Sequence, residues 1–279
     1  MAEPSVHAFD APGRVGVRVE IPAGSLSVEA WAEPRVEVEV AAARGDERSV
    51  AAAEETRVSA AERGGRHEIA VRAPKREGGR LGISWGRGPE LAVTVRCPEG
   101  ADLVLATHSA DLETRGRLGA VSARTASGDA TLEDSVALSY TTASGDLTAG
   151  AVAGTLTTKS ASGDVAVRSA NGAVTVNTVS GDVRIGETPA SVGVNTVSGD
   201  VELESVGGPC RVSCVSGDVQ VATRPGLALW IDAQSVSGSV TSELDVADAP
   251  AGGGGQQVDL RIRTVSGDVR ITRSGAPVA

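Results

Sequence analysis

Apolar and polar residues alternate in short runs through most of this chain, and the stretch from Asp164 to Asp182 shows the pattern clearly. The run Val165–Val167 alternates with a period of two, and so does Val174–Val176 after an Asn-Gly pair. Side chains with that period point to opposite faces of a β-strand, so each run predicts a strand with one buried face. The Asn-Gly pair and the following Ser-Gly-Asp triplet are typical of turns. The stretch therefore predicts one coil of two short strands and two turns.

The Ser-Gly-Asp triplet recurs along the chain at a nearly fixed interval, with Ala replacing Gly in the first copy and Ser replacing Asp in the eighth. Successive serines are 18, 17, 18, 18, 18, 18, 21 and 29 residues apart. The position after each triplet holds Leu, Ala or Val, and the next position varies among charged, polar and small residues. This pattern predicts stacked coils with a buried column beside a solvent-facing one. We predict an all-β fold, a parallel β-helix or β-solenoid of about 18 residues per coil, with strands about 4.8 Å apart.

The first hundred residues are less regular but still rich in strand patterns. An Ala/Glu-rich run predicts one short helix, Asp46–Glu55, and the segments on either side predict further strands. A turn is expected at Pro22-Ala23-Gly24, a hairpin from residues 56–60 and 68–72, and a Gly-rich loop at residues 247–257. We predict residues 1–100 to be irregular β-rich N-terminal coils and a cap, followed by the β-solenoid at residues 101–279, in one continuous domain.

Charge and composition argue against several classes of function. The formal net charge is -10 and the pI is about 4.9, which disfavours nucleic acid because phosphate binding relies on clustered Lys and Arg. No apolar stretch approaches the roughly 20 residues of a membrane span, and Met1–Asp10 does not resemble a signal peptide. Three cysteines suit a reducing compartment better than a disulfide framework. We expect a cytoplasmic protein without a transmembrane segment.

The aspartates of the triplets are the sharpest chemical feature, because stacking the coils places them in one ladder. Like charges at that spacing repel, so something must offset them. One interpretation is that each Asp accepts backbone N–H groups in its own turn, with Gly supplying a positive φ. The alternative is a ladder of calcium or other hard-cation sites, although calcium β-rolls carry more glycines at half this spacing. The first is favoured, so no cofactor is expected. The ladder consists of Asp111, Asp129, Asp146, Asp164, Asp182, Asp200, Asp218 and Asp268.

Two further columns precede each triplet. Thr, Ser or Cys stands at one position and Ala or Val at the next, as in Thr178-Val179 and Thr196-Val197. Neighbours on a strand face opposite ways, so an inward Thr column places the Val column outside as an association surface. A bend that buries both columns is the alternative, and the sequence does not choose between them.

Patterns for catalysis are weak. Cys210 and Cys214 occupy an apolar column and the Thr column, and a Cys-x3-Cys pair without His partners is a poor metal motif. His108, Ser109 and Asp111 are neighbours in one strand and cannot converge as a catalytic triad does. We expect no enzyme, and we keep one candidate contact for a ligand or partner, Trp85 in a Gly-rich loop.

The recurring Thr-Val-Ser-Gly-Asp-Val, as at Thr178–Val183 and Thr196–Val201, accompanies the opening phrase Ile-Pro-Ala-Gly-Ser-Leu-Ser-Val at residues 21–28. Together they resemble the bacterial putative-adhesin family of unknown function, also called toastrack domains, over nearly the whole chain. The resemblance implies a β-solenoid, often encoded near cell-envelope stress systems and regulatory operons, with no catalytic residues to transfer.

We therefore expect a non-enzymatic β-solenoid scaffold or protein-interaction module, linked to cell-envelope stress or regulation, whose partner is another protein or a further copy of itself. Solenoids present long surfaces suited to such binding. The alternative is an adhesin or a carbohydrate- or cation-binding surface protein, which predicts glycan binding that depends on Trp85.

Overall fold

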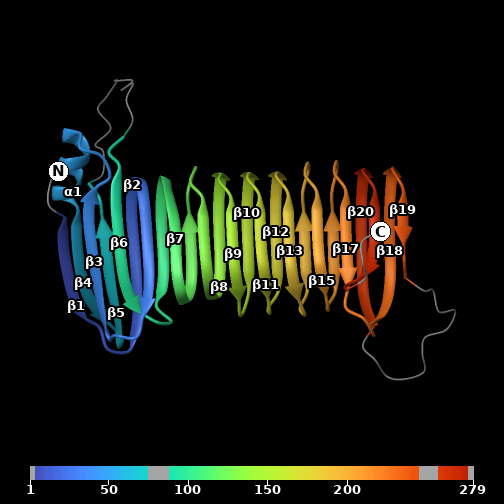
Figure 1. Cartoon of the computed structure of the whole chain (residues 1–279), viewed down its shortest axis with the longest axis horizontal. Helices are drawn as coiled ribbons and strands as arrows, with labels where there is room; N and C mark the ends of the chain where they lie inside the picture. Colours follow the sequence, from blue (N-terminus) through green and yellow to red (C-terminus); the bar gives the residue numbers. More distant parts are fainter. Residues whose placement is uncertain (1–3, 75–87, 245–256, 276–279) are drawn as a thin grey trace. The chain divides into compact units, whose positions relative to one another are not determined.

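The computed structural model describes residues 4–74, 88–244 and 257–275, and most of them lie in β-strands (Figure 1). The chain forms two compact units, Met1–Val136 and Ala137–Ala279. Strand β8 (Ala130–Ser144) contains the division between them.

Two long strands organise the first unit. β2 (Arg14–Trp31) and β7 (Asp102–Arg124) pair in parallel over much of their length. Beside the first part of β2 lies β5 (Arg66–Arg72) in parallel, and β4 (Arg57–Arg63) pairs antiparallel with β5 as the predicted hairpin.

The second part of β2 belongs to another row of strands. β6 (Leu91–Pro98) pairs with it in parallel, and β3 (Arg35–Ala42) and then β1 (Ser5–Asp10) continue the row in antiparallel pairs. The turn expected at Pro22-Ala23-Gly24 is a bend inside β2 instead. There β2 leaves its partner β5 and joins β6, so the sheet continues where the turn sequence suggested a break.

The predicted helix is present as α1 (Glu47–Glu55), which packs against β3 and β6. Asp46 is its N-cap, and the carboxylate accepts the backbone N–H of Ser49 at 2.9 Å, one of the N–H groups that a helix start leaves without a partner. This bond and the Ser49 hydroxyl hold the pKa of Asp46 below its usual value. The Ser49 Oγ accepts the backbone N–H of Glu90 at 3.1 Å, which ties the helix to the start of β6.

The second unit repeats one coil, with one strand in each of two layers. The register advances by 18 residues per coil, so Val165 pairs with Val183 and Val183 with Val201. All pairings in this unit are parallel, which confirms the predicted parallel β-solenoid. In chain order, layer A contains β10 (Leu156–Ser162), β12 (Val174–Ser180), β14 (Val192–Asn195) and β16 (Cys210–Ser213). Layer B contains β9 (Leu147–Val152), β11 (Val165–Ala170), β13 (Val183–Thr188), β15 (Val201–Val206) and β17 (Val219–Thr223).

The last coils do not stack in chain order. After β17 the chain forms β18 (Ala228–Ser237) and β19 (Val240–Ser242), and later β20 (Gln257–Ser266) and β21 (Val269–Arg273). β20 lies between β16 and β18, and β21 lies between β17 and β19. The coil that is last in sequence is thus next to last in space, as the colours of Figure 1 show. The Gly-rich loop predicted at residues 247–257 falls, except for Gln257, outside the described residues.

The interior of these coils is built from the predicted apolar columns. Val165, Val183, Val201 and Val269 are buried, and the residues between the inward positions face solvent or are half-buried. Branched side chains of similar size repeat in every coil, so the layers pack without aromatic residues except the buried Tyr140. The predicted inward and outward faces of the strands are confirmed.

Candidate binding surfaces

The Ser-Gly-Asp corners explain why the triplet repeats. Gly181 has a φ of +129°, and a Cβ added to it would lie 2.2 Å from the carbonyl oxygen of Gly163 in the preceding coil. The same arrangement recurs at Gly199 and Gly217. A side chain at this position would meet both an unfavourable backbone conformation and a backbone atom, so the stacking of corners requires glycine.

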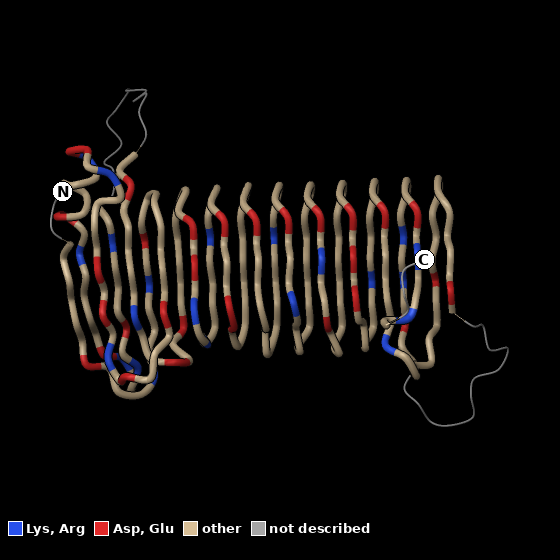
Figure 2. Tube along the Cα trace, in the orientation of Figure 1, with Lys and Arg blue, Asp and Glu red and all other residues tan. Residues whose placement is uncertain are grey.

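The aspartates that follow these glycines bond from coil to coil. The backbone N–H of Asp182 donates to Oδ1 of Asp164 at 2.8 Å, and the bond repeats at Asp200 and Asp218. The expected bond lay within one turn, whereas the structure places the donor in the next coil. Figure 2 shows the resulting row of acidic residues at one level of the coils. Each carboxylate thus accepts a fixed N–H, which offsets the repulsion between stacked charges.

Asp268 and Ser239 end this ladder. The backbone N–H of Ser239 donates to Oδ1 of Asp268 at 2.7 Å. Together with the Ser239 side chain, this bond holds the pKa of Asp268 below its usual value. Ser239 lies in the outermost coil, beyond which no further coil of the described residues offers an N–H to a carboxylate. The one triplet without Asp therefore marks the end of the stack.

The Thr and Val columns face opposite ways, which decides between the two alternatives left open by the sequence. Thr178 and Thr196 are buried, and their hydroxyls donate to the carbonyl oxygens of Ser180 and Ser198, which closes the corner. The valine column lies outside, with side chains between 47% and 82% exposed. Its members, in the order of the coils, are Val179, Val197, Val215, Val265 and Val236.

The outward positions of layer A around these valines carry few acidic groups. The adjacent outward column of layer A includes Asn177, Asn195 and Ser213, and the amide of Asn195 donates to Oδ1 of Asn177 at 3.0 Å. Basic side chains enter this layer toward the last coils. We call the outward side of β10, β12, β14, β16, β20 and β18, including the valine column, the valine face.

The outward side of layer B is different in character. Arg184 and Glu202 face each other across β13 and β15, and Nε of Arg184 lies 2.7 Å from Oε2 of Glu202. Arg168 and Arg270 are exposed on the same side, on β11 and β21. Charged side chains dominate this side, so the exposed apolar column belongs to the valine face alone among the described coils.

Sequence comparison assigns the family. The model of the family described as Toastrack DUF4097 matches residues 16–272. The chain belongs to this family. The resemblance suggested by the repeated phrase is thereby confirmed, and the match spans both units of this Toastrack chain. No curated protein matches the sequence.

Solved structures similar to the Toastrack chain have low sequence identity. A "putative adhesin" from Bacteroides fragilis NCTC 9343 is 9% identical, with 97% of this chain and 98% of that chain covered and a TM-score of 0.45. A "putative lipid binding protein" from Parabacteroides distasonis ATCC 8503 is 11% identical, with 97% of each chain covered and a TM-score of 0.40. A "putative cell adhesion protein" from Clostridium sporogenes ATCC 15579 is 11% identical, with 97% of this chain and 100% of that chain covered and a TM-score of 0.24.

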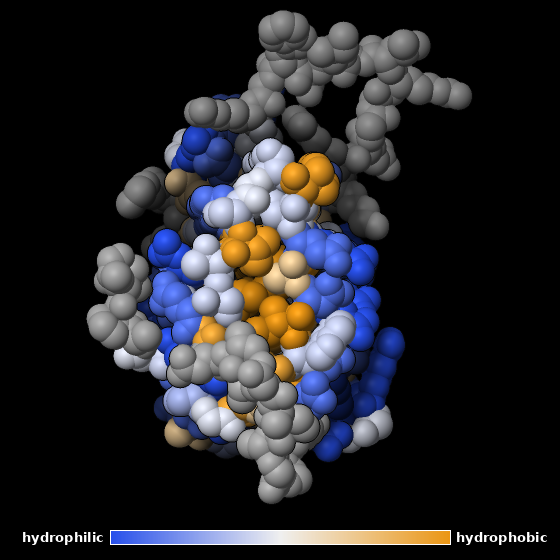
Figure 3. Space-filling view, turned by 90° about the vertical axis from the view of Figure 1, so that its right-hand side faces the viewer, coloured by the Kyte–Doolittle hydropathy of each residue, from blue (hydrophilic) through white to orange (hydrophobic). Residues whose placement is uncertain are grey.

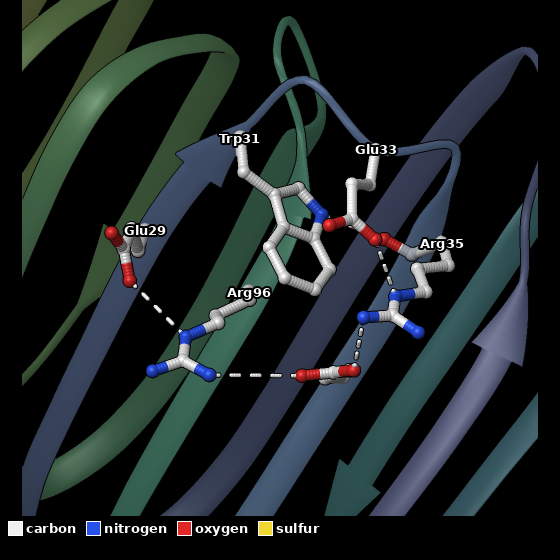
Figure 4. A network of polar contacts seen from close by, with 6 residues as sticks. Glu29, Trp31, Glu33, Arg35 and Arg96 are labelled. Atoms are coloured by element: carbon white, nitrogen blue, oxygen red, sulfur yellow. Dashed lines mark hydrogen bonds and ion pairs between the residues drawn. The ribbon is translucent and has the colours of Figure 1, made fainter.

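A network of polar contacts surrounds Trp31 in the first unit of the Toastrack chain (Figure 4). The indole N–H donates to the carbonyl oxygen of Arg35 at 2.9 Å, and the Arg35 guanidinium lies over the ring, 5.1 Å from its centre. Arg35 also pairs with Glu33 and Glu37 at 2.8 and 3.0 Å. The cation already covers a face of the indole, so the cluster holds β2 and β3 together rather than offering a sugar platform.

A cavity of about 450 Å³ lies in the first unit beside Arg66 and Asp102. The guanidinium of Arg66 pairs with Asp102 at 2.9 Å, and the other oxygen of Asp102 accepts the backbone N–H of Ala120 at 2.7 Å. Gly16 leaves the space that the guanidinium fills. The Arg66 and Asp102 side chains are thus engaged in structural contacts within the first unit.

The other residues that the sequence singled out are Trp85, the three cysteines and the aspartates of the ladder. Trp85 lies outside the described residues. Cys97, Cys210 and Cys214 are free and buried, and burial raises the pKa of Cys97 and Cys210 to about 12. Within residues 4–74, 88–244 and 257–275, no three His, Cys, Asp or Glu side chains lie close enough to hold a metal ion. The expectation that the aspartate ladder holds no cofactor, with calcium as the alternative, stays a prediction.

In the described part of the chain, no helix has the length and apolar character of a membrane span.

The aspartate and valine columns were predicted from the sequence, but two features were not: the composition of the whole valine face and the exposed last coil. The Ser at position 239 was the available signal for the latter.

Proposed function

We propose that the protein is a non-enzymatic scaffold that binds another protein through the valine face. The observation that carries this proposal is the column of valines exposed in register on successive coils. The Thr side chains of the neighbouring column occupy the interior at this corner, so packing inside the coil does not require apolar side chains at the valine positions. A long exposed apolar row on a rigid surface is typical of a protein-binding site.

The size of the apolar contribution indicates what the partner must also provide. Burying a half-exposed valine contributes about 1 kcal/mol, so the five valines contribute on the order of 5 kcal/mol. Association itself costs at least that much in lost freedom of motion. The partner must therefore add polar contacts, and the Asn177 and Asn195 amides beside the valines offer them. We infer a partner with a straight row of small apolar side chains flanked by hydrogen-bonding groups.

The cellular setting is part of the same proposal. Three free, buried thiols suit the cytoplasm, where disulfides are rare. The setting expected from the family resemblance is cell-envelope stress or regulation, so we propose the partner to be a cytoplasmic or membrane-associated protein of such a system. The acidic net charge supports a protein rather than a nucleic acid.

Affinity capture with matched variants tests this proposal. The tagged protein, the double variant Val179→Lys/Val197→Lys and the control Thr148→Lys/Gln220→Lys are used on soluble and membrane fractions of the source organism. Both variants add two lysines at outward positions, so they change the charge equally. The proposal expects a specific protein that the wild type and the control retain and the valine variant loses.

The captured protein is then purified, and its affinity for the three forms is measured directly. Binding to the valine variant should be at least about tenfold weaker, which corresponds to 1.4 kcal/mol. Equal binding to all three forms would show that the valine face is not the site and would refute the proposal. Loss of binding only in the control would assign the interaction to layer B.

A further inference from the structure

The outermost coil of the second unit leaves part of the solenoid interior uncovered. Ile231 and Val240 occupy the inward columns, paired in register with Leu260 and Val269 of the neighbouring coil. Leu260 and Val269 are at most 1% exposed, whereas Ile231 and Val240 are 36% and 45% exposed. No strand among the described residues lies beyond β18 and β19. The interior columns therefore end at a surface, and Figure 3 shows hydrophobic side chains gathered along the middle of this end, with hydrophilic ones on both sides.

The edge strand at this end has little protection against pairing with another strand. Natural sheet edges are usually blocked by Lys, Pro, bulges or inward-pointing charges. β18 has the sequence ALWIDAQSVS, in which Asp232 is the one charged residue. Asp232 lies in the outward column, where it faces Arg263 at 3.8 Å, so no charge points into the exposed interior. The free side of β18 thus offers backbone hydrogen-bonding groups beside apolar side chains.

The size of this end suits a second copy of the chain. A strand of ten residues is about 33 Å long. With two layers about 10 Å apart and their side chains, the end measures roughly 33 by 18 Å, or on the order of 600 Å² per copy. Two copies would bury on the order of 1,200 Å², which is the lower end of the range for specific protein interfaces.

The residue at the last position of the aspartate ladder indicates the relative orientation of the two copies. A head-to-tail continuation of the coils would give the last triplet a next N–H to accept, and an Asp would be expected there. The residue is Ser239, whose N–H already donates to Asp268. A two-fold pair, in which β18 of one copy runs antiparallel to β18 of the other, needs no carboxylate at that corner.

We propose that the protein forms a two-fold dimer by antiparallel pairing of β18 with β18 of a second copy, centred at Ile231. In this register Ile231 faces Ile231 of the second copy, and Trp230 faces Asp232. A register centred one residue later would place Asp232 directly opposite Asp232, and like charges in that position destabilise a pair of strands. This interface uses the free edge and the inward column of β18, whereas the valine face is the outward side of the layer, with Val179 and Val197 in coils away from this end. A dimer that does not form at β18 would therefore leave the proposed function untouched.

The test is sedimentation equilibrium of the full-length protein across concentrations, together with two lysine variants. Ile231→Lys places a charge in the exposed inward column at the interface, and Val197→Lys is the matched control on the valine face. The wild type and the control should form dimers with the same dissociation constant. Ile231→Lys should raise this constant at least about tenfold.

A cysteine variant gives a second readout that does not depend on a disruptive change. Ile231→Cys should form a disulfide-linked dimer under mild oxidation, because the two thiols meet at the two-fold axis, while Val197→Cys should not. The native thiols at Cys97, Cys210 and Cys214 are buried and do not compete. A monomer at every concentration with no cross-link at position 231 would overturn the proposal. A dimer that Val197→Lys dissociates and Ile231→Lys does not would also overturn it.

Discussion

Replacing Gly181 by Ala should be among the most damaging single-methyl changes in the second unit. Two separate effects act there, a positive φ and the close approach of the Gly163 carbonyl oxygen. The chain offers a matched glycine for each effect alone. Gly226 has a φ of +82° with no atom within 4 Å of an added Cβ, and Gly186 has no positive φ but would place its Cβ 2.2 Å from the Arg168 carbonyl oxygen. Gly193 has neither problem, with its nearest atom at 3.9 Å.

The magnitudes follow from these distances. A Cβ rarely approaches another atom within 3.0 Å, so Gly181→Ala must move two stacked corners apart by about 0.8 Å. Overpacking of this kind costs about 1 to 3 kcal/mol, and a positive φ on Ala adds about 1 kcal/mol. We expect a loss of about 2 to 4 kcal/mol for Gly181→Ala. For Gly226→Ala the loss should be about 1 kcal/mol, and for Gly186→Ala about 1 to 3 kcal/mol. Gly193→Ala should stay within about 0.5 kcal/mol of the wild type.

The four variants are compared by urea unfolding followed by far-ultraviolet circular dichroism. The slope of the transition should be unchanged, so that the shift in midpoint reports stability. The midpoint should fall furthest for Gly181→Ala and least for Gly193→Ala. If Gly181→Ala unfolds at the same urea concentration as Gly193→Ala, the corners are not stacked at the distance described, and the explanation of the repeated triplet is wrong.

Two further predictions concern titrating groups. Cys97 and Cys210 should not react with iodoacetamide in the folded protein at pH 8, because burial raises their pKa to about 12. All three thiols of the chain should react in urea. Mass spectrometry measures the labelling, and fast labelling of the folded protein would contradict the burial of these thiols. Hydrogen bonds from Ser239 hold the pKa of folded Asp268 below its usual value, so its contribution to stability is fully present above about pH 5 and is lost as the pH falls through the folded pKa. The melting temperature should therefore fall less between pH 5 and pH 3 in Asp268→Asn than in the wild type, and equal falls would refute the assignment.

The sequence predicted the solenoid well because its columns repeat with the period of the coils. Val165, Val183 and Val201 are the same residue type at equivalent positions of successive coils, although the residues beside them in the sequence differ. Such repetition is a direct consequence of the stacking of coils. The helix was predictable for a local reason, since Asp46 caps an Ala-rich run. The beginning of the chain was predicted less well because β2 bends between two rows of strands without a turn, and that depends on distant partners in β5 and β6.

The binding surfaces were only partly predictable. Alternation along the strand predicted that the side chains of Thr178 and Val179 point in opposite directions if the strand is straight. The sequence does not predict whether the backbone bends at this corner. The structure supplies it through the hydroxyl bond from Thr178 to the Ser180 carbonyl. The order of the last coils is a matter of tertiary pairing over long range, although Ser239 in place of Asp was a local sign of it.

The proposed binding face depends most on one alternation, in which the Thr178 side chain points into the coil and the Val179 side chain points to solvent. Single cysteines at these two adjacent positions report it directly, because the native thiols are buried and give little background. Each variant is labelled in the folded state with a water-soluble maleimide, and the rate is compared with that in urea. The account predicts that Val179→Cys reacts nearly as fast folded as unfolded and that Thr178→Cys is strongly protected. Equal rates at the two positions, or protection of position 179, would contradict the outward valine column and the binding face built on it.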